Sequence, residues 1–234
     1  MLLKGKNVSR ETIYSSKNIK KIIIKESFND EVLTYMKKNH INYTILPDKD
    51  FNMRYKDAQG IVVETGDYQY ASFDECLKNT TNNSLCVILD SIEDPQNFGN
   101  IIRSFEALGG SFIIIPKNRS IEVNETVAKV SAGAYAHVKI TQVTNLNQAI
   151  SKLKDNGYWV MGTDMDGDTD YDNVRVDMPI ALIIGSEGFG MSKLIKQNCD
   201  YLLRIPMVGK INSLNASISC AIVMSDIVSR RRKL

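Results

Sequence analysis

Three polar segments carry the residues that could do chemistry, and each of them follows an apolar run of the chain. They are Asp90–Arg103 (DSIEDPQNFGNIIR), Gly185–Met191 (GSEGFGM) and Ile205–Asn215 (IPMVGKINSLN). The apolar runs CVILD, ALIIG and YLLRIP have the composition of buried parallel strands. Ligands of an open α/β sheet bind at the carboxyl ends of its strands. The three segments are therefore expected to meet at one ligand site.

The glycine-rich segment predicts a close approach of backbone to a ligand, because glycines leave room and a helix start offers N–H groups. The run GSEGFGMS nearly matches the phosphate-binding loop G-x-x-x-x-G-K-[ST], but Met191 occupies the lysine position. A thioether cannot neutralise a triphosphate, which argues against an NTPase. The glycine order also differs from the dinucleotide fingerprint G-x-G-x-x-G. A tight strand-to-helix turn is the alternative interpretation.

The other two segments hold candidate site residues near the expected helix starts. Asn97 is a candidate helix cap, and Arg103 follows it six positions later. Both side chains can reach the strand ends if Asn97 lies in the turn before the helix. Ser213 could cap the last helix, which would put Asn215 in the first turn, where asparagine is a poor helix former. That broken local rule favours a functional role for Asn215.

The sequence does not indicate a metal site. The two histidines, His40 and His137, are far apart, and the four cysteines form no CxxC pair, whereas zinc ligands are closely spaced. The acidic run Asp164–Asp172 does not fit an EF-hand loop, because Thr169 or Tyr171 stands where the loop needs glycine and Arg175 stands where it needs glutamate. We interpret that run as a solvated surface loop.

The elements that must position these segments alternate between strands and helices. Residues 1–76 predict a small α/β domain, with strands at 21–25, 43–46 and 60–64 and a helix at 29–39. The polar residues 77–84 predict a linker. Residues 85–234 predict a parallel α/β sheet of five or more strands, at 86–90, 112–116, 158–162, 180–185 and 201–206. The helices of this second domain are expected at 97–108, 122–132, 145–156 and 213–230.

Composition and charge leave the partner open. The chain has 234 residues, 43% hydrophobic and 24% charged, as ordinary globular proteins have. It shows neither an apolar run of about 18 residues nor a signal-peptide pattern, so we expect a cytoplasmic protein without a membrane span. The net charge is only +2, but cations cluster near both ends. They either contact RNA phosphates or form solvated faces; the candidates are Lys4, Arg10, Lys20 and Lys21, and the run 230–233.

Taken together, the three segments resemble the motifs of the SpoU (TrmH-type) branch of the SPOUT RNA 2′-O-methyltransferases. DPQNFGNIIR is similar to the first motif with its Asn and Arg, IIGSEGFGMS to the second with its Glu, and IPMVGKINSLNAS to the third with its Ser-Leu-Asn. The resemblance covers residues 85–234. Its length and layout are most similar to RlmB-like enzymes, which methylate a guanosine of 23S rRNA.

RlmB-like enzymes carry a ribosomal-protein-like (L30e-like) RNA-binding domain. Two segments of this chain, GKNV (5–8) and YQYASFDE (68–75), resemble the usual ends of that domain. The chain departs from that domain at Ala58, where His is common before Gln-Gly. This departure bears on RNA specificity more than on the chemistry. A tRNA target, or a non-catalytic RNA-binding assembly factor, are the alternatives. An NTP-binding regulator would rest on GSEGFGMS alone.

The resemblance implies a C-terminal trefoil knot, a homodimer, and S-adenosylmethionine as cofactor without a metal. Arg103 would contact the ribose 2′-OH and the adjacent phosphate, and Asn97 would orient Arg103 or the ribose. Glu187 would hold the target nucleotide or an arginine of the other subunit, and Ser213 and Asn215 would position the sugar and the cofactor. The implied cofactor pocket consists of Gly162, Thr163, Gly185, Ile205, Met207 and Leu214.

Overall fold

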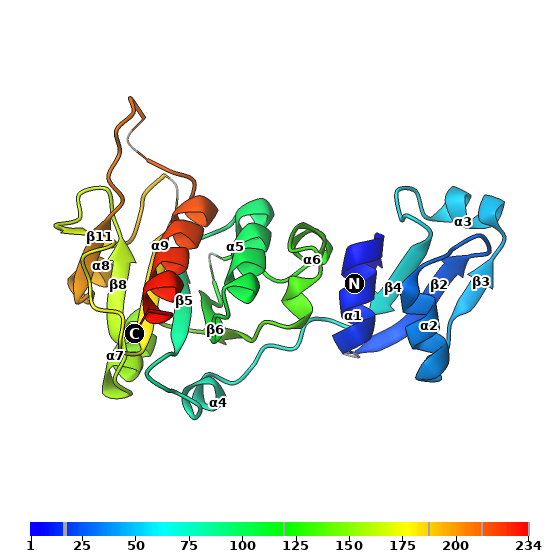
Figure 1. The fold of residues 1–234 in the computed structure, drawn as a ribbon, viewed down its shortest axis with the longest axis horizontal. Helices are drawn as coiled ribbons and strands as arrows, with labels where there is room; N and C mark the ends of the chain where they lie inside the picture. The colour runs from blue at the N-terminus through cyan, green and yellow to red at the C-terminus, as the bar shows by residue number, and fades with distance from the viewer. Residues whose placement is uncertain (16–17, 119, 187, 212, 234) are drawn as a thin grey trace. The chain divides into compact units, whose positions relative to one another are not determined.

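The computed structural model describes residues 1–15, 18–118, 120–186, 188–211 and 213–233, which form two compact units (Figure 1). The N-terminal unit comprises Met1–Gln69 and Val123–His137, and the C-terminal unit comprises Tyr70–Glu122 and Val138–Leu234. This division differs from the expected boundaries at 76 and 85 in two ways. Residues 70–84 belong to the C-terminal unit, and 123–137 leave it to complete the N-terminal one.

The N-terminal unit is built on a four-stranded sheet in the order β1-β4-β2-β3. Strand β4 runs antiparallel to β1 and β2, and β3 pairs in parallel with β2. The three predicted strands are present, whereas β1 is only three residues long and left no periodic signal. The elements are β1 (Leu2–Lys4), α1 (Lys6–Ser15), β2 (Ile19–Lys25), α2 (Glu31–Lys38), β3 (Thr44–Leu46), α3 (Asp48–Arg54) and β4 (Ile61–Thr65).

The segment 123–137, with helix α6 (Glu125–Val130) and a short 3-10 turn (Ala134–Ala136), packs on this sheet and on α1. The Tyr135 and Thr12 hydroxyls are 2.9 Å apart, and the His137 ring nitrogen Nε2 lies 2.9 Å from a Glu11 carboxylate oxygen. Gly133 makes the approach possible, because a Cβ there would lie 2.6 Å from the Glu11 Cβ. Side-chain and backbone contacts therefore assign this segment to the N-terminal unit.

Asp30 joins α1 to α2 in the N-terminal unit. Its carboxylate accepts hydrogen bonds from the Val32 N–H, at 3.1 Å, and from the Arg10 guanidinium, at 3.0 Å. Burial acts to raise the pKa of Asp30, but these hydrogen bonds and the charge of Arg10 outweigh burial and lower it. The carboxylate is thus stabilised in the folded protein, both as a helix cap and as an ion-pair partner.

We expect Asp30→Ala to reduce the free energy of unfolding by about 2 kcal/mol at neutral pH. The folded-state pKa of Asp30 is lowered, so its stabilisation is complete above the unfolded-state pKa, about 3.9, and is lost as pH falls through the folded value. Urea unfolding at pH 7 and pH 3 measures this, with the exposed Glu26→Ala as control. Equal losses at both pH values would contradict the ion-pair explanation.

The C-terminal unit contains a seven-stranded sheet in the order β7-β6-β5-β10-β8-β11-β9, in which every pair is parallel. The central strands β5 and β10 are buried along their length, except for Gly185 at the end of β10. All five predicted strands are present, and β7 and β9 are additions. The strands are β5 (Leu85–Asp90), β6 (Phe112–Pro116), β7 (Ile140–Val143), β8 (Trp159–Thr163), β9 (Thr169–Asp170), β10 (Ile180–Gly185) and β11 (Tyr201–Arg204).

Five helices of the described residues belong to this unit, and α5 and α9 pack against each other beside the sheet (Figure 1). Asp94 caps α5 through the Asn97 N–H, so the expectation that Asn97 is the cap was wrong, and Asn97 lies within the first turn. Pro95 opens the helix, and Gly109 follows its end with φ +71°. None of the helices in the described ranges is long and apolar enough to span a membrane. The helices are α4 (Phe73–Leu77), α5 (Pro95–Ala107), α7 (Leu146–Asp155), α8 (Lys193–Gln197) and α9 (Ala216–Arg231).

Two arginines of the C-terminal basic run have a structural role. Arg230 donates to Asp226, at 2.8 Å, and to the Val174 carbonyl. Arg231 donates to the carbonyls of Val176 and Met178, at 2.8 and 2.7 Å, and its burial lowers its pKa. Their guanidinium groups hold the end of α9 against neighbouring loops. The interpretation of these two residues as phosphate contacts is therefore not supported.

Candidate active site

The three polar segments meet at the carboxyl end of the parallel sheet, as their positions after strands predicted. Asp90 and Gly185 lie in register at the ends of β5 and β10. The Asp90 carboxylate, 8% exposed, accepts a hydrogen bond from the Ser192 N–H at 3.0 Å, which ties the first segment to the residues just after the second. Ser91 has φ +62°, a conformation that non-glycine residues rarely adopt and that occurs often at functional sites.

A side-chain hydrogen bond ties the first segment to the third. The Asn215 amide donates to the Asn97 Oδ1 at 2.7 Å, and Asn97 is 7% exposed. Asn215 Oδ1 accepts from the Ser217 N–H at 2.9 Å, so Asn215 is itself the cap of α9. This corrects the expectation that Ser213 caps the helix and that Asn215 breaks a rule within its first turn. Asparagine is a favoured residue at a helix cap, and Asn215 in addition joins two segments.

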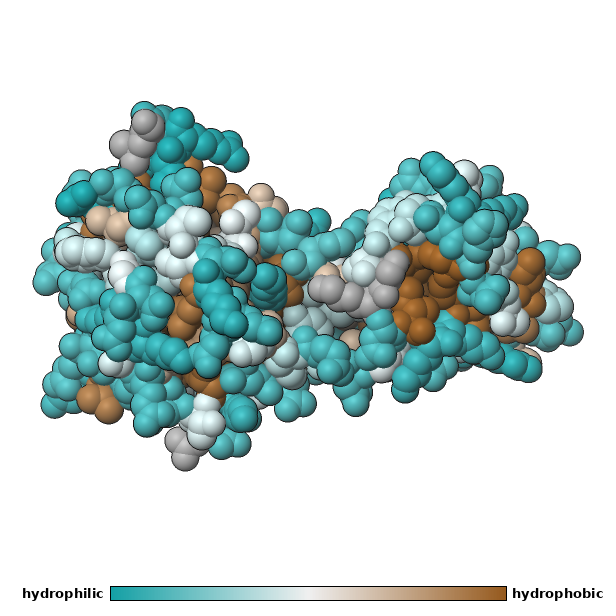
Figure 2. All heavy atoms as spheres, turned by 90° about the horizontal axis from the view of Figure 1, so that it is seen from below, coloured by the Kyte–Doolittle hydropathy of each residue, from teal (hydrophilic) through white to brown (hydrophobic). Residues whose placement is uncertain are grey.

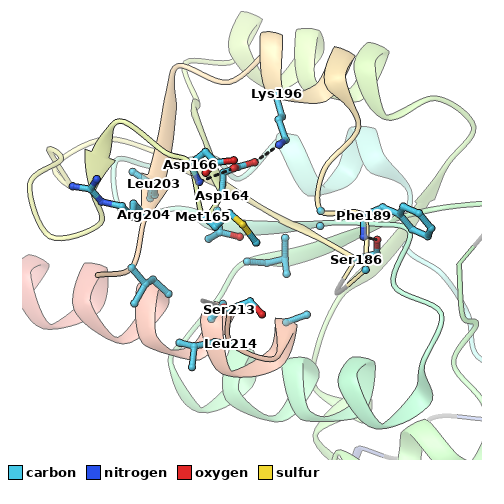
Figure 3. Close-up of a pocket in the computed structure, with 18 of the residues that line it drawn as sticks. Asp164, Met165, Asp166, Ser186, Phe189, Lys196, Leu203, Arg204, Ser213 and Leu214 are labelled. Atoms are coloured by element: carbon cyan, nitrogen blue, oxygen red, sulfur yellow. Dashed lines mark hydrogen bonds and ion pairs between the residues drawn. The ribbon is translucent and has the colours of Figure 1, made fainter. Parts of the chain in front are cut away.

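A pocket of about 580 Å³ is lined by the second and third segments and by the residues at the end of β8 (Figure 3). Five of the six residues expected to bind the cofactor line it: Thr163, Gly185, Ile205, Met207 and Leu214. The sixth, Gly162, lies behind the pocket wall, where a Cβ would stand 2.6 Å from the Met191 Sδ and 2.9 Å from the Cys199 Sγ. Gly162 thus gives room for the packing under the pocket.

One wall of the pocket is polar and was missed in the sequence. Asp164, Met165 and Asp166 line it, so the acidic run begins as a pocket wall and is not wholly a solvated loop. Asp164 is largely buried and forms an ion pair with Lys196 at 2.5 Å (Figure 3). The position of these residues in the sequence could have identified them, because they directly follow β8 and ligands bind at the carboxyl ends of parallel strands.

The glycine-rich segment forms a tight turn at the pocket. The Ser186 N–H donates to the Gly190 carbonyl at 3.2 Å, and the Gly190 N–H donates back to the Ser186 carbonyl at 2.8 Å. Gly190 has φ +63°. A Cβ on Gly185 would lie 2.3 Å from the Gly190 carbonyl carbon, so the turn packs directly on the end of β10. The predicted tight turn is confirmed, and the turn also lines the pocket. Its close approach to a ligand stays a prediction.

Arg103 lies beside the pocket and not in it. It is exposed on α5 and lines a second groove together with Ser217 and Ile218 of α9. The first turns of α9 separate the two hollows, since Ala216 and Ser219 face the pocket. Of the other predicted catalytic residues, Ser213 lines the pocket, Asn97 and Asn215 form the joint described above, and Glu187 lies outside the described residues.

A protein-family model, the SpoU rRNA Methylase family, matches residues 84–225. A Staphylococcus haemolyticus protein assigned by name to the TrmH family of tRNA/rRNA methyltransferases is 40% identical over all of this chain and 97% of its own length. A Staphylococcus aureus protein of the same name is 41% identical over 97% of this chain and 95% of its own. The chain belongs to the SpoU/TrmH family of RNA methyltransferases.

Two solved structures share the fold of this SpoU/TrmH family member. The SpoU methyltransferase AviRb of Streptomyces viridochromogenes, in complex with the cofactor AdoMet, has a TM-score of 0.84 at 21% identity and covers 100% of this chain and 91% of its own. The AdoMet-bound rRNA methyltransferase of Sinorhizobium meliloti has a TM-score of 0.79 at 22% identity, with 100% and 87% covered.

The joint between Asn97 and Asn215 gives a testable prediction for the family site. Asn215→Ser keeps a favoured cap residue but removes the amide donor to Asn97. We expect it to lower stability by about 1 kcal/mol and to lower activity by more than the stability loss explains. A double-mutant cycle with Asn97→Ala measures the coupling in both properties. Additive effects would contradict a joint between these side chains.

The cysteines near the site are unsuited to nucleophilic chemistry at neutral pH. Burial raises the pKa of Cys199 to about 11 and that of Cys220 to about 12. The thiolate is the reactive form, so both thiols stay protonated. In the described part of the chain, no group of three or more His, Cys, Asp or Glu side chains could hold a metal ion.

The four RNA-binding candidates differ in their environments. Lys20 and Lys21 are exposed on β2, and Lys4 is half-buried on β1. Arg10 pairs with Asp30 at 3.0 Å and Glu31 at 3.2 Å, which raises its pKa. Its guanidinium is held by carboxylates, so Lys20 and Lys21 are the better candidates for phosphate contacts.

Proposed function

We propose that the protein is an S-adenosylmethionine-dependent RNA 2′-O-methyltransferase that acts on a guanosine of 23S rRNA. One observation carries the proposal. The second and third family motifs line a pocket at the ends of the parallel strands, and an exposed arginine of the first motif lies in the adjoining groove. A cofactor and an RNA ribose can approach such a pair of hollows from different sides.

The pocket suits S-adenosylmethionine in size and in chemistry. Its volume falls within the range of about 300–1,000 Å³ that is usual for small-molecule sites. Gly185 and Gly190 offer backbone groups for an adenine, Leu203 and Leu214 offer apolar contacts, and Lys196 and Asp164 offer charge. When bound, S-adenosylmethionine supplies an already activated methyl group, so no metal is required.

Arg103 would act through its charge. A guanidinium stays protonated in proteins, so Arg103 is not the base. We propose that it contacts the phosphate next to the target ribose and stabilises the negative charge that develops on the 2′-oxygen. The proton of the 2′-OH then leaves to water or to an RNA phosphate oxygen.

The remaining motif residues would position the reactants. Asn97 and Asn215 fix the start of α9 between the pocket and the groove, and Ser213 would contact the sugar. Glu187 would hold the target nucleotide or an arginine of a second subunit by charge-assisted hydrogen bonds.

We further propose an L30e-like RNA-binding role for the N-terminal unit, a trefoil knot at the C-terminus, and a homodimer. Exposed lysines on β2 support the first. The second is supported by the residues of 185–190 and 205–214 that line one pocket. The half-exposed Ile218 and the neighbouring Ile222 in the α9 groove support a contact between subunits there.

Transfer of tritium from labelled S-adenosylmethionine to RNA tests the proposal. The RNA should come from cells that lack this gene, and the ribose methyl groups should then be mapped in rRNA and tRNA. A new mark on a 23S rRNA guanosine is expected. A mark in tRNA would reassign the substrate, and RNA binding without any transfer would favour the non-catalytic assembly factor.

A further inference from the structure

Phe189 is an aromatic residue that the site as described does not use. Its side chain is 96% exposed, although it belongs to the turn that lines the pocket. Figure 3 shows the ring at the edge of the pocket, directed away from the other labelled residues. Trp159, by comparison, is 41% exposed and stacks on Tyr201 with ring centroids 5.7 Å apart. The face of the molecule drawn in Figure 2 is largely hydrophilic, with hydrophobic atoms in separate areas.

A single exposed hydrophobic residue is ordinary on a protein surface and does not by itself indicate a binding site. The backbone that holds the Phe189 ring in place is the further observation. The two hydrogen bonds between Ser186 and Gly190 close the turn around Phe189, and its own N–H donates to the Ser186 Oγ at 3.4 Å. The close packing of Gly185 on Gly190 fixes this turn on the end of β10. Little backbone entropy would be lost when a ligand covers a ring that is held in this way.

The chemistry of the phenyl ring indicates which class of ligand it can bind. A phenyl ring offers neither charge nor a hydrogen bond to a phosphate or a ribose hydroxyl, but it offers a flat face. Unpaired RNA bases stack on such faces, and stacking accepts any base because every base has a π-face. A ring at the rim of the pocket is placed to meet the base of a nucleotide whose sugar enters the site.

We propose that Phe189 stacks on an unpaired base beside the reacting ribose and thereby positions the RNA strand. This inference rests on the proposed function and deepens it. The enzyme then requires a target in a loop or other unpaired region, and the contact adds affinity without reading sequence.

Kinetics on RNA from cells that lack this gene test the inference, with Phe189→Ala, Phe189→Leu and Phe189→Tyr. Loss of one stacked base weakens binding by roughly 5- to 100-fold, so Phe189→Ala should raise KM for RNA by that factor and leave S-adenosylmethionine affinity unchanged. Phe189→Tyr should keep the wild-type KM, whereas Phe189→Leu should not. Leu194→Ala, which removes another exposed apolar side chain on α8, is the control and should not change KM.

Three results would overturn the inference. A wild-type KM for Phe189→Ala would show that the ring does not contact RNA. Full rescue by Phe189→Leu would show that apolar bulk suffices and that no stacking occurs. A shift of Phe189→Ala from dimer to monomer in sedimentation would identify the ring as a subunit contact. If the wild-type protein transfers no methyl group to any RNA, the proposed function itself fails, and the inference fails with it.

Discussion

Replacing Arg103 with alanine is expected to lower methyl transfer to RNA by about 10²- to 10³-fold, the usual effect of removing one group that stabilises transition-state charge. S-adenosylmethionine affinity should not change, because Arg103 lines the groove beside α9 and not the pocket. The fold should also be unaffected. Arg103 is exposed on α5, and no described carboxylate lies within ion-pair distance of its guanidinium.

Single-turnover kinetics measure the rate of methyl transfer by Arg103→Ala, and calorimetric titration measures its affinity for S-adenosylmethionine. Arg103→Lys should recover part of the rate, since lysine keeps the charge but loses the planar fork that grips a phosphate. Glu106→Ala removes a charge from the exposed side of the same helix and is the matched control. Near-normal turnover by Arg103→Ala would rule out every role that we assign to this guanidinium.

The sequence predicted the central part of the fold because its strands are buried on both faces. Strands such as β5 and β10 appear as continuous apolar runs bounded by turn residues. The strands that escaped prediction are short or lie at the rim of a sheet. β9 has two residues and β1 has three, too few for any period, and both depend on pairing with distant strands.

The domain boundaries were harder to predict because contacts decide them. Residues 123–137 read as one more helix of the α/β alternation, and nothing in their composition reveals the partners Thr12 and Glu11. The linker was predicted from the polar run at 78–84, but Ser84 is buried and its carbonyl accepts from the Ile180 N–H. A polar segment can be well ordered when its backbone groups form hydrogen bonds with neighbouring strands.

The candidate site was predictable in its parts and not in their arrangement. Asn97 and Arg103 lie six positions apart, which separates their directions around a helix by about 120°, a third of a turn. They therefore face different surroundings, one buried against Asn215 and the other in the groove. Lys196 was missed because it lies in the last turn of the short helix α8, outside the three polar segments.

Replacing Gly185 with alanine is expected to weaken S-adenosylmethionine binding by at least about tenfold, or 1.4 kcal/mol. The added Cβ would lie 2.3 Å from the Gly190 carbonyl carbon and 2.4 Å from the Met191 nitrogen. Both are backbone atoms, so a change of side-chain rotamer cannot relieve the clash. The turn itself must shift, and overpacking of this kind typically costs about 1–3 kcal/mol.

Gly188→Ala is the matched control for Gly185→Ala, because it adds the same methyl group to the same turn. No described atom lies within 4 Å of a Cβ at Gly188, so this variant should bind S-adenosylmethionine as the wild type does. Calorimetric titration measures both affinities, and thermal unfolding shows whether each variant is folded. Wild-type affinity in both variants would mean that the turn can move without consequence, and that S-adenosylmethionine binds elsewhere than in the pocket at the end of β10.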